Sequence, residues 1–440
     1  MDYASAPRVS IHALGCKLNH AELEDYGRRL EAHGFLLVGP REEADAYILN
    51  TCTVTSEADR KVRQWLRSMR KRNPDALIVA AGCSVERQPR QLGSLADVVL
   101  GNGYKGRLPD VVAGYLRERH PGQAVRGTRL WKPRSRATVK IQEGCSLRCA
   151  YCVIPLVRGP ERSVPVQRVV GEVADRVREG HPEIVLTGTR VGAYSHEGTH
   201  LSDLVRRVLA VDGLRRLRLS SLQPYELSPA FLENLSDSRV CPHVHMSLQS
   251  GSAGVLGRMR RGYSPSTFLA AMDKLRRSSP HMAVTTDVIV GFPGESELEF
   301  QETVAFCEEA GFSRIHVFPF SPRPGTPAAD MDGVLPSAVL RERAALMNRV
   351  AVRSRIQYEE SCLGSVREAL WEGETEPGSG VWTGTTEDYI HVLTDTAVPF
   401  NHIERVLLDR IEGDKVWARR LCENSGRSET ELEGPGHRGR

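Results

Sequence analysis

Three cysteines stand close together in one short stretch of the chain. Cys145, Cys149 and Cys152 follow one another at C-x3-C-x2-C spacing, directly after the strand-like run 137–141. A loop this tight can bind three corners of a 4Fe-4S cube, which leaves the fourth iron open to another molecule. The alternatives are buried free cysteines or a zinc knuckle. A closed structural zinc site needs four ligands, and no fourth Cys or His lies within twenty residues on either side.

Three further cysteines follow apolar runs in the N-terminal region. Each run is followed by a helical stretch, which is the pattern of a doubly wound α/β sheet; the runs are 9–14, 46–50 and 77–81. Cys16, Cys52 and Cys83 come just after these predicted strands. Because ligands of such sheets bind outside the carboxyl ends of the strands, the three thiols could converge on one site. We therefore predict a second cluster with three protein ligands; the alternative is three buried structural cysteines.

Several separate motifs around these cysteines occur in a recognisable order. They are 15–19 (GCKLN), 50–55 (NTCTVT), 144–159 (GCSLRCAYCVIPLVRG), 183–188 (EIVLTG), 216–224 (RLRLSSLQP), 243–261 (HVHMSLQSGSAGVLGRMRR), 286–295 (TDVIVGFPGE) and 315–327 (IHVFPFSPRPGTP). Together they resemble the radical S-adenosylmethionine (SAM) enzymes, and more closely the methylthiotransferase family. The motif at 50–55 resembles the branch that acts on N6-threonylcarbamoyladenosine of transfer RNA. Three positions depart from the expected pattern: His20 stands in place of Gln, Val164 in place of Arg and Gln223 in place of Glu.

The resemblance implies an enzyme with two 4Fe-4S clusters and SAM. Cys145, Cys149 and Cys152 would hold the radical SAM cluster, and Cys16, Cys52 and Cys83 an auxiliary cluster. One SAM would supply the 5'-deoxyadenosyl radical and another a methyl group, so that C2 of N6-threonylcarbamoyladenosine at position 37, beside the anticodon, becomes methylthiolated. The partners would be tRNA and an electron donor such as flavodoxin or ferredoxin.

Three other functions remain open at this point. The same chemistry could act on N6-isopentenyladenosine or on an aspartate of a ribosomal protein. A protein of another class, a non-catalytic iron–sulfur RNA-binding or electron-transfer protein, would bind clusters but leave SAM uncleaved. Such a protein would not explain the glycine-rich strand ends of the central region.

Bulk properties are those of a multi-domain protein of a reducing compartment. The 440 residues carry a net charge of +4, so composition alone does not indicate a nucleic-acid binder. No run approaches eighteen apolar residues, and residues 1–7 lack the pattern of a signal peptide, so we expect a cytoplasmic protein without a membrane span. Ten cysteines fit metal ligation better than a disulfide scaffold. The four outside the two groups are Cys241, Cys307, Cys362 and Cys422.

The central region alternates strand-like and helix-like segments. The strands are expected at 137–141, 184–186, 216–219, 244–248, 286–290 and 314–318, which predicts an open, partial parallel (βα)6 barrel. Enzymes of this type keep their chemistry at the carboxyl ends of the strands, and those ends are polar or glycine-rich here. By the resemblance, the SAM pocket would involve Tyr151, Thr187, Gly188, Ser220, Ser221, Gln249, Gly291 and Pro293.

From residue 364 the pattern is all-β. Five short runs separated by Gly, Pro and Asp predict a small barrel, and its position resembles the TRAM domain, a module thought to grip tRNA. A basic helix over residues 60–72 could also hold RNA phosphates, or could be a solvated surface. We predict four parts: an N-terminal α/β domain over 1–125, a radical SAM barrel over 130–360, a TRAM-like barrel over 361–422 and a disordered tail over 423–440. The segment 126–136 reads as a linker or clamp.

Overall fold

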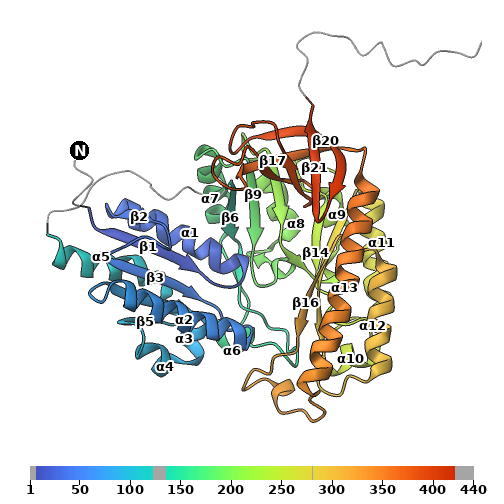
Figure 1. Ribbon diagram of the computed structural model, residues 1–440, viewed down its shortest axis with the longest axis horizontal. Coiled ribbons are helices and arrows are strands. Elements are labelled where there is room, and N and C mark those ends of the chain that lie inside the picture. Colours follow the sequence, from blue (N-terminus) through green and yellow to red (C-terminus); the bar gives the residue numbers. More distant parts are fainter. Residues whose placement is uncertain (1–5, 122–134, 280, 422–440) are drawn as a thin grey trace, which may run out of the picture. The chain divides into compact units, whose positions relative to one another are not determined.

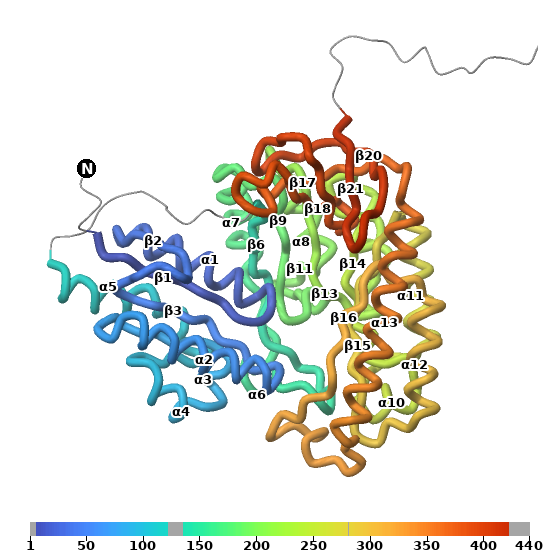
Figure 2. Tube along the Cα trace, in the orientation of Figure 1, coloured from blue at the N-terminus to red at the C-terminus, as the bar shows by residue number. Residues whose placement is uncertain are grey.

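The computed structural model describes residues 6–121, 135–279 and 281–421 (Figure 1). It has two compact units: the first runs to Ser361 and includes Glu387–Tyr389, and the second comprises the remaining residues from Cys362. Most of the predicted linker at 126–136 and the whole predicted tail from 423 lie outside the described residues. The trace in Figure 2 can be followed through the first unit from the blue N-terminal strands to the orange helix α13 (Ser337–Cys362).

The N-terminal region is a five-stranded parallel sheet, as expected for a doubly wound fold. Its strand order is β2 (Leu36–Val38), β1 (Arg8–Ala13), β3 (Ala46–Thr51), β4 (Leu77–Gly82) and β5 (Val98–Leu100). The three predicted strands are confirmed as β1, β3 and β4, and β3 and β4 are buried throughout, which explains their unbroken apolar runs. The outer strands β2 and β5 were not predicted, because three residues are too few to show a period.

Helices cover both faces of this sheet (Figure 1). One apolar cluster joins the sheet to α1 (Lys17–Ala32) and α5 (Leu108–Arg119), and a second joins the opposite face to α2 (Ser56–Arg72). The hydroxyl of Thr55 begins α2 by accepting a hydrogen bond from the Ala58 amide. Two short helices follow β4: α3 (Cys83–Arg87) and α4 (Pro89–Gly93).

The central region is a parallel barrel of six strand–helix units that does not close. The strands are β6 (Arg136–Lys140), β9 (Glu183–Thr187), β12 (Arg216–Leu219), β14 (His243–Met246), β15 (Ala283–Val290) and β16 (Arg314–Pro319), as predicted. The strand β12 ends before Ser220, and the chain continues as β13 (Ser221–Leu222). The strands of the barrel wall therefore form two sheets, β12-β9-β6 and β13-β14-β15-β16. Among the described residues β6 and β16 are the outer strands of this wall, which leaves the barrel open between them.

Helices pack on the outside of the barrel wall. They are α7 (Val166–Arg178), α8 (Leu201–Leu209), α9 (Pro229–Asn234), α11 (Pro265–Ser278), α12 (Glu297–Ala310) and α13. Shorter elements lie in the loops at the ends of the strands: β7 (Gln142–Glu143), α6 (Ile154–Arg158), β8 (Arg162–Ser163), β10 (Ser195–His196), β11 (Thr199–His200) and α10 (Ala253–Arg258).

The two faces of the barrel strands have different compositions. Alternate residues such as Val139, Leu186 and Val244 belong to the large apolar core shared with the outer helices. The residues between them face the lumen, because successive side chains of a strand point to opposite faces. Many of these inner residues are charged or polar. They include Arg136, Glu183, Arg218, His243, His245, Asp287 and His316.

The second unit is a closed five-stranded barrel, in agreement with the predicted small barrel. Its strand order is β17 (Val366–Glu374), β18 (Trp382–Thr386), β19 (His391–Thr394), β21 (Lys415–Arg420) and β20 (Ile403–Glu412). Trp371 is fully buried in it, and Gly384 leaves room for that ring, since a Cβ there would lie 2.7 Å from Trp371 Cε3.

Buried charges stabilise one side of the lumen. Glu183 receives hydrogen bonds from Arg216 Nε at 2.9 Å and Arg218 Nε at 2.7 Å, and all three side chains are buried. Burial alone would raise the pKa of Glu183, but the charges of Arg218 and Arg216 lower it to about 2. Both arginines therefore share this carboxylate as a buried counterion.

We predict that Glu183→Gln lowers the free energy of unfolding of the barrel by about 3–5 kcal/mol, because two buried guanidinium groups lose their counterion. Thermal unfolding would show this as a lower midpoint. The control Glu233→Gln, at an exposed position of α9, should change the free energy of unfolding by less than about 0.5 kcal/mol. Because the folded-state pKa is depressed, the contribution of Glu183 is fully present above about pH 4.5 and is lost as the pH falls toward 2. An unchanged midpoint at pH 7 would contradict this account.

Candidate active site

The loop that carries Cys145, Cys149 and Cys152 is held in place by its own backbone. Gly144 has a φ of +77°, and a Cβ there would lie 1.9 Å from the carbonyl oxygen of Pro160, so only glycine fits. The Cys145 amide donates to the carbonyl of Gly159 at 3.0 Å, and the Ala150 amide to that of Met259 at 2.9 Å. These bonds fix both ends of the loop against the barrel.

The three thiols of this loop interact with one another. Burial, followed by the charges of Cys149 and Cys145, raises the pKa of Cys152 to about 12. The pKa of Cys145 is also raised, first by burial and then by Cys149. Arg261 Nη1 donates to Cys149 Sγ at 3.3 Å. Three close thiols in a poorly solvated loop are a donor set that deprotonates when it binds metal, and it fits three corners of a cluster.

The N-terminal cysteines converge as the strand pattern predicts. Cys16 and Cys52 follow β1 and β3, the two strands between which the order of the sheet reverses, and this is where doubly wound sheets bind ligands. A Cβ on Gly15 would lie 2.5 Å from Cys52 Sγ. Burial, followed by the charges of Cys16 and Cys83, raises the pKa of Cys52 to about 12. This second set of three thiols also fits three corners of a cluster.

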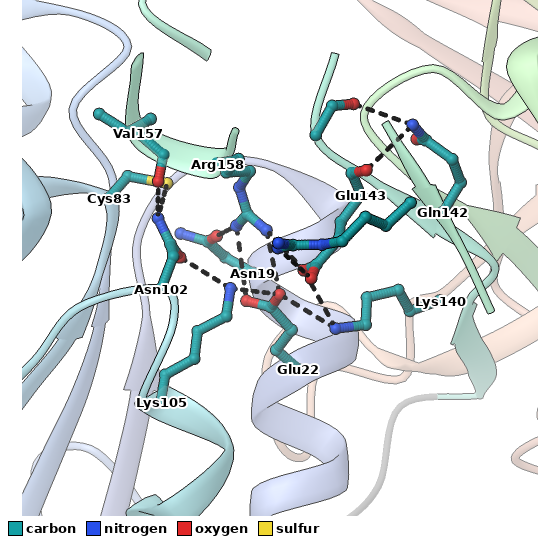
Figure 3. A network of polar contacts seen from close by, with 12 residues as sticks. Asn19, Glu22, Cys83, Asn102, Lys105, Lys140, Gln142, Glu143, Val157 and Arg158 are labelled. Carbon is teal, nitrogen blue, oxygen red and sulfur yellow. Dashed lines mark hydrogen bonds and ion pairs between the residues drawn. The ribbon is translucent and has the colours of Figure 1, made fainter. Parts of the chain in front are cut away.

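The two cysteine groups are packed against each other. Cys83 forms a small apolar cluster with Val153 and Val157, which lie one and five residues after Cys152 in the sequence. Asn102 Nδ2 lies 3.6 Å from Cys83 Sγ and donates to the Val157 carbonyl at 2.6 Å. The segment that follows one group therefore forms part of the surroundings of the other (Figure 3).

A buried ionic network centred on Glu22 joins the same two regions (Figure 3). Glu22 Oε1 on α1 accepts hydrogen bonds from Lys105 Nζ at 2.6 Å and Arg158 Nη1 at 3.0 Å, with Lys140 Nζ at 3.5 Å. Arg158 Nη2 also donates to Asn19 Oδ1 at 2.6 Å. Burial opposes ionisation of Glu22, but the charges of Arg158 and Lys105 hold its pKa far below its ordinary value. The carboxylate is therefore ionised and fastens α1 to the cysteine loop of the barrel.

A second ionic contact lies on the other side of the open barrel. Arg323, after β16, forms a buried ion pair with Asp59 of α2, and its Nη2 donates to Thr53 Oγ1 at 2.8 Å. Ser84 Oγ, next to Cys83, donates to Asp59 Oδ1 at 3.0 Å. Because α1 also contacts β6, where the Thr138 amide donates to Glu24 at 3.1 Å, the N-terminal region spans the gap between β6 and β16.

A cavity of about 190 Å³ is lined by residues of both the N-terminal region and the barrel. Val54 and Thr55, just after Cys52, line one side of it. The barrel lines the other side with Tyr151, Cys152, Gln249, Asp287, Ile289 and Phe318. The cavity is therefore next to one cysteine of the barrel loop and to the segment that follows one cysteine of the N-terminal group.

The predicted SAM-pocket residues lie at or beside the carboxyl ends of barrel strands, but they do not all line this cavity. Tyr151 and Gln249 do. Thr187, Gly188, Ser220 and Ser221 lie at the ends of β9 and β12, where the buried Ser220 Oγ has no hydrogen-bond partner among the described residues. A buried hydroxyl of this kind fits a polar ligand. Gly291 faces the helix side, since a Cβ there would lie 2.2 Å from Leu340 Cδ1, and Pro293 follows in the same turn.

The three departures from the family pattern have different surroundings. Gln223 accepts a hydrogen bond from Arg261, the arginine that contacts Cys149, so this position lies beside the cysteine loop. Val164 is part of the edge of the barrel core, and its amide donates to the Ile141 carbonyl at 2.8 Å. His20 lies in the first turn of α1.

The charged residues around the thiols were not predicted from the sequence. Arg158 and Arg261 are both inside quoted motifs, yet nothing in the pattern indicates that they reach Glu22 and Cys149. Their partners are distant in sequence, and a pairing of this kind has no local signal. The one hint in the sequence is that each of these arginines stands inside a glycine-containing motif.

Comparisons with known proteins match both cysteine regions. A family model described as the Radical SAM superfamily matches residues 139–307, and one described as "Uncharacterized protein family UPF0004" matches residues 8–101. Among solved structures, a radical SAM methyltransferase, TsrM from Kitasatospora setae, matches with a TM-score of 0.54 at 16% identity, over 74% of this chain and 75% of that chain. At that identity the match concerns the fold.

Curated relatives match nearly the whole chain. The threonylcarbamoyladenosine tRNA methylthiotransferase MtaB of Thermotoga maritima is 37% identical over 90% of this chain and 94% of its own length. The Bacillus subtilis enzyme of the same name is 37% identical over 88% and 90%. The tRNA-2-methylthio-N(6)-dimethylallyladenosine synthase of Syntrophotalea carbinolica is 34% identical over 86% and 91%. No helix in the described part of the chain is both long and apolar enough to cross a membrane.

Proposed function

Because the chain belongs to the radical SAM methylthiotransferase family, we propose that it methylthiolates C2 of N6-threonylcarbamoyladenosine at position 37 of tRNA. The observation that carries the proposal is the identity of 37% with threonylcarbamoyladenosine methylthiotransferases, over about nine-tenths of this chain and of theirs. Family membership also favours an enzyme over a non-catalytic iron–sulfur protein. The residues fit the chemistry, since a cavity is lined both by Cys152 of the barrel group and by Val54 and Thr55, which follow Cys52 of the N-terminal group.

The proposed cofactors are two 4Fe-4S clusters and SAM. When bound, they supply a 5'-deoxyadenosyl radical able to remove the unreactive C2 hydrogen, together with the sulfur and the methyl group of the product. We assign Cys145, Cys149 and Cys152 to the first cluster and Cys16, Cys52 and Cys83 to the second. Arg261 places positive charge beside Cys149, and Arg158 does so beside Cys16 and Cys83. These arginines favour the thiolate forms that bind iron.

The protein's own groups would hold the substrates. Tyr151 and Gln249 line the cavity beside Cys152, and Ser220 offers an unpaired buried hydroxyl at a strand end. The N-terminal region covers the open side of the barrel and so limits access of water to the lumen. An electron donor such as flavodoxin or ferredoxin would provide the reducing equivalent.

The main alternative substrate is a tRNA adenosine that carries a neutral, apolar N6 substituent. Dimethylallyladenosine synthases are among the relatives, at 34% identity. The lumen beside the cavity is polar, with Asp287 and His245 at its wall, and a polar substituent can exchange hydrogen bonds with such a wall whereas an apolar one cannot. This feature favours the threonylcarbamoyl substituent.

We assign RNA binding to the second unit and to α2. The second unit is the proposed TRAM-like domain, and Arg405 and Arg419 are exposed on its strands. On α2, Arg60 and Arg70 already pair with Glu57 and Asp97. Phosphate contacts from the remaining exposed cations would supply affinity without reading sequence.

The first prediction from this assignment concerns iron. Anaerobic reconstitution should load about eight irons per chain, and the triple variant Cys145→Ala, Cys149→Ala, Cys152→Ala should keep about four. Colorimetric iron and sulfide analysis measures both. Cys307→Ala, at a buried position of α12 away from both groups, is the control and should keep the full complement. A parent protein with a single cluster would refute the two-site assignment.

A second prediction separates radical formation from sulfur insertion. With SAM, a strong reductant and modified tRNA, Cys52→Ala should still form 5'-deoxyadenosine but no methylthiolated base. The reason is that reductive cleavage of SAM needs only the cysteines of the barrel. Cys149→Ala should form neither product. Liquid chromatography with mass detection follows both products in one anaerobic reaction. Normal amounts of methylthiolated base from Cys52→Ala would exclude the N-terminal group as the place of the sulfur.

The third prediction concerns RNA binding by the second unit. Replacing Arg405 and Arg419 together by Gln should weaken tRNA binding, and the logarithm of the binding constant should change less steeply with salt, because each lost phosphate contact reduces that slope by about 0.7–0.9. Filter binding at several salt concentrations measures this. Cleavage of SAM without RNA should persist and reports that the first unit is folded. An unchanged affinity and salt slope would assign RNA binding elsewhere.

A further inference from the structure

A second and larger cavity, of about 410 Å³, adjoins the cysteine loop of the barrel. Cys145, Cys149 and Cys152 all line it, whereas of these three only Cys152 lines the cavity of about 190 Å³. Gln249 and Asp287, which line the smaller cavity from the barrel side, do not contribute to the larger one. The cysteine loop therefore adjoins two separate cavities, and the larger one is in contact with all three thiol-bearing residues.

The charged side chains that line the larger cavity are two arginines. Arg148 stands between Cys145 and Cys149 in the loop, and Arg260 follows α10. Both are exposed, and within the described part of the chain neither guanidinium group has a hydrogen bond or an ion pair. No Asp or Glu of the described residues lines this cavity. The cavity therefore presents two positive charges to solvent, directly beside the cysteines.

The backbone at Arg260 holds this charge in an unusual place. Its φ is +58°, a left-handed conformation that costs an L-residue roughly 1–2 kcal/mol and that glycine adopts readily. The Arg260 amide donates to the Gly257 carbonyl at 3.0 Å, and the carbonyl of Met259 accepts from the Ala150 amide at 2.9 Å. The turn that carries Arg260 is thus bonded to the cysteine loop. An arginine where glycine would be less strained indicates a role for its side chain.

An exposed apolar side chain lines the same cavity. Leu156 of α6 is 56% exposed, although leucine is a residue that proteins usually bury. A Cβ on Gly325 would lie 3.5 Å from Leu156 Cδ1, so the backbone after β16 approaches this side chain without covering it. Pro155, Pro160 and Pro327 also line the cavity. A small apolar surface that carries arginines is typical of a transient protein–protein interface.

We propose that the surface formed by Arg148, Arg260 and Leu156 is the docking site of the electron donor, and that this donor is an acidic one-electron carrier protein. The inference rests on the proposed function, which requires a reducing equivalent at these cysteines. The docked carrier gives up one electron, which the iron–sulfur group on the three cysteines accepts; no covalent bond forms or breaks. Because electron transfer slows steeply with distance, the carrier has to dock beside the cysteines. Acidic groups on the carrier complement the two arginines and speed the encounter.

Transfer RNA is the competing occupant, because its phosphates are also attracted to arginine. Sites that follow a nucleic-acid backbone combine a positively charged groove with aromatic side chains on which bases stack. The larger cavity has two arginines and no aromatic residue among the described residues that line it, and its exposed apolar groups are Leu156 and prolines. Such groups complement an apolar patch on a protein, whereas a phosphate backbone offers them no partner. The composition of the surface therefore favours a protein.

The test uses an acidic flavodoxin as the carrier. Fluorescence anisotropy of labelled, oxidised flavodoxin measures its affinity for the reconstituted enzyme, and the rate of 5'-deoxyadenosine formation at limiting reduced flavodoxin measures kcat/KM for the carrier. In Arg148→Gln with Arg260→Gly, both quantities should fall about three- to tenfold at low salt. They should approach the parent's values at roughly 1 M salt, where the Debye length is about 3 Å. Leu156→Ser should weaken binding at every salt concentration, since apolar burial is not screened.

The matched control is Arg215→Gln with Arg277→Gln, which removes the same net charge at exposed positions before β12 and on α11. It should keep the parent's affinity for flavodoxin. Arg260→Gly alone should show part of the loss, and its relaxed backbone keeps the loop folded. Iron content reports that the loop is intact in each variant.

Unchanged flavodoxin affinity in both the double variant and Leu156→Ser, or an equal loss in the control, would overturn the docking surface. A loss of tRNA affinity with unchanged flavodoxin affinity would also overturn it, in favour of an RNA contact. The proposed function is tested separately, with dithionite in place of the carrier. If the parent protein with dithionite, SAM and modified tRNA forms no methylthiolated base, the proposed function fails, while the affinities for flavodoxin still decide the docking surface.

Discussion

The ionised carboxylate of Glu22 is the contact on which the geometry of the site depends. It lies on α1, nearly two turns after Cys16, and it pairs with Arg158 at the end of α6, the short helix that follows the barrel's cysteine loop. Neither charge is solvated, so each requires the other, and removing one would leave an uncompensated buried charge. Because both partners sit beside cysteines, a contact that stabilises the interface also sets the distance between the two thiol groups. Arg323 and Asp59 do the same on the far side of the barrel opening. The N-terminal region therefore covers the opening between β6 and β16.

Most of the architecture could be predicted because it has local signals. Parallel strands buried on both faces, such as β3 and β4, appear as continuous apolar runs, and the ends of barrel strands appear as glycine and serine clusters. The cysteine spacing indicated which loops should converge, and the structure brings both groups together. The strands β2 and β5 were missed because they are too short to show a pattern, and the break at Ser220 because a single residue between β12 and β13 leaves no mark in the sequence.

The surroundings of the thiols could not be predicted, because they depend on pairs that lie far apart in the chain. Arg158 and Glu22 are separated by 136 positions, and His245 and Asp287 by 42. Each residue alone looks like an ordinary surface charge. Only the tertiary fold shows that these charges are buried and complementary. The predicted pocket residues show the same limit: Gln249 faces the cavity, whereas Gly291 is small because Leu340 packs over it.

The alternation along the barrel strands has an evolutionary consequence. Outward residues such as Val139, Leu186 and Val244 carry the packing that holds the helices to the wall, and the inward residues near the cavity make few apolar contacts. Substitutions at His245, Asp287 or His316 therefore act mainly on what the lumen accepts, with a small cost in folding. Near the other end of the strands, Glu183, Arg216 and Arg218 form a buried ionic group that resists change, because the two arginines share one carboxylate. Relatives that share this fold can thus come to modify different bases by changing the inward face of a few strands. The outward face of the same strands keeps the packing that the fold requires.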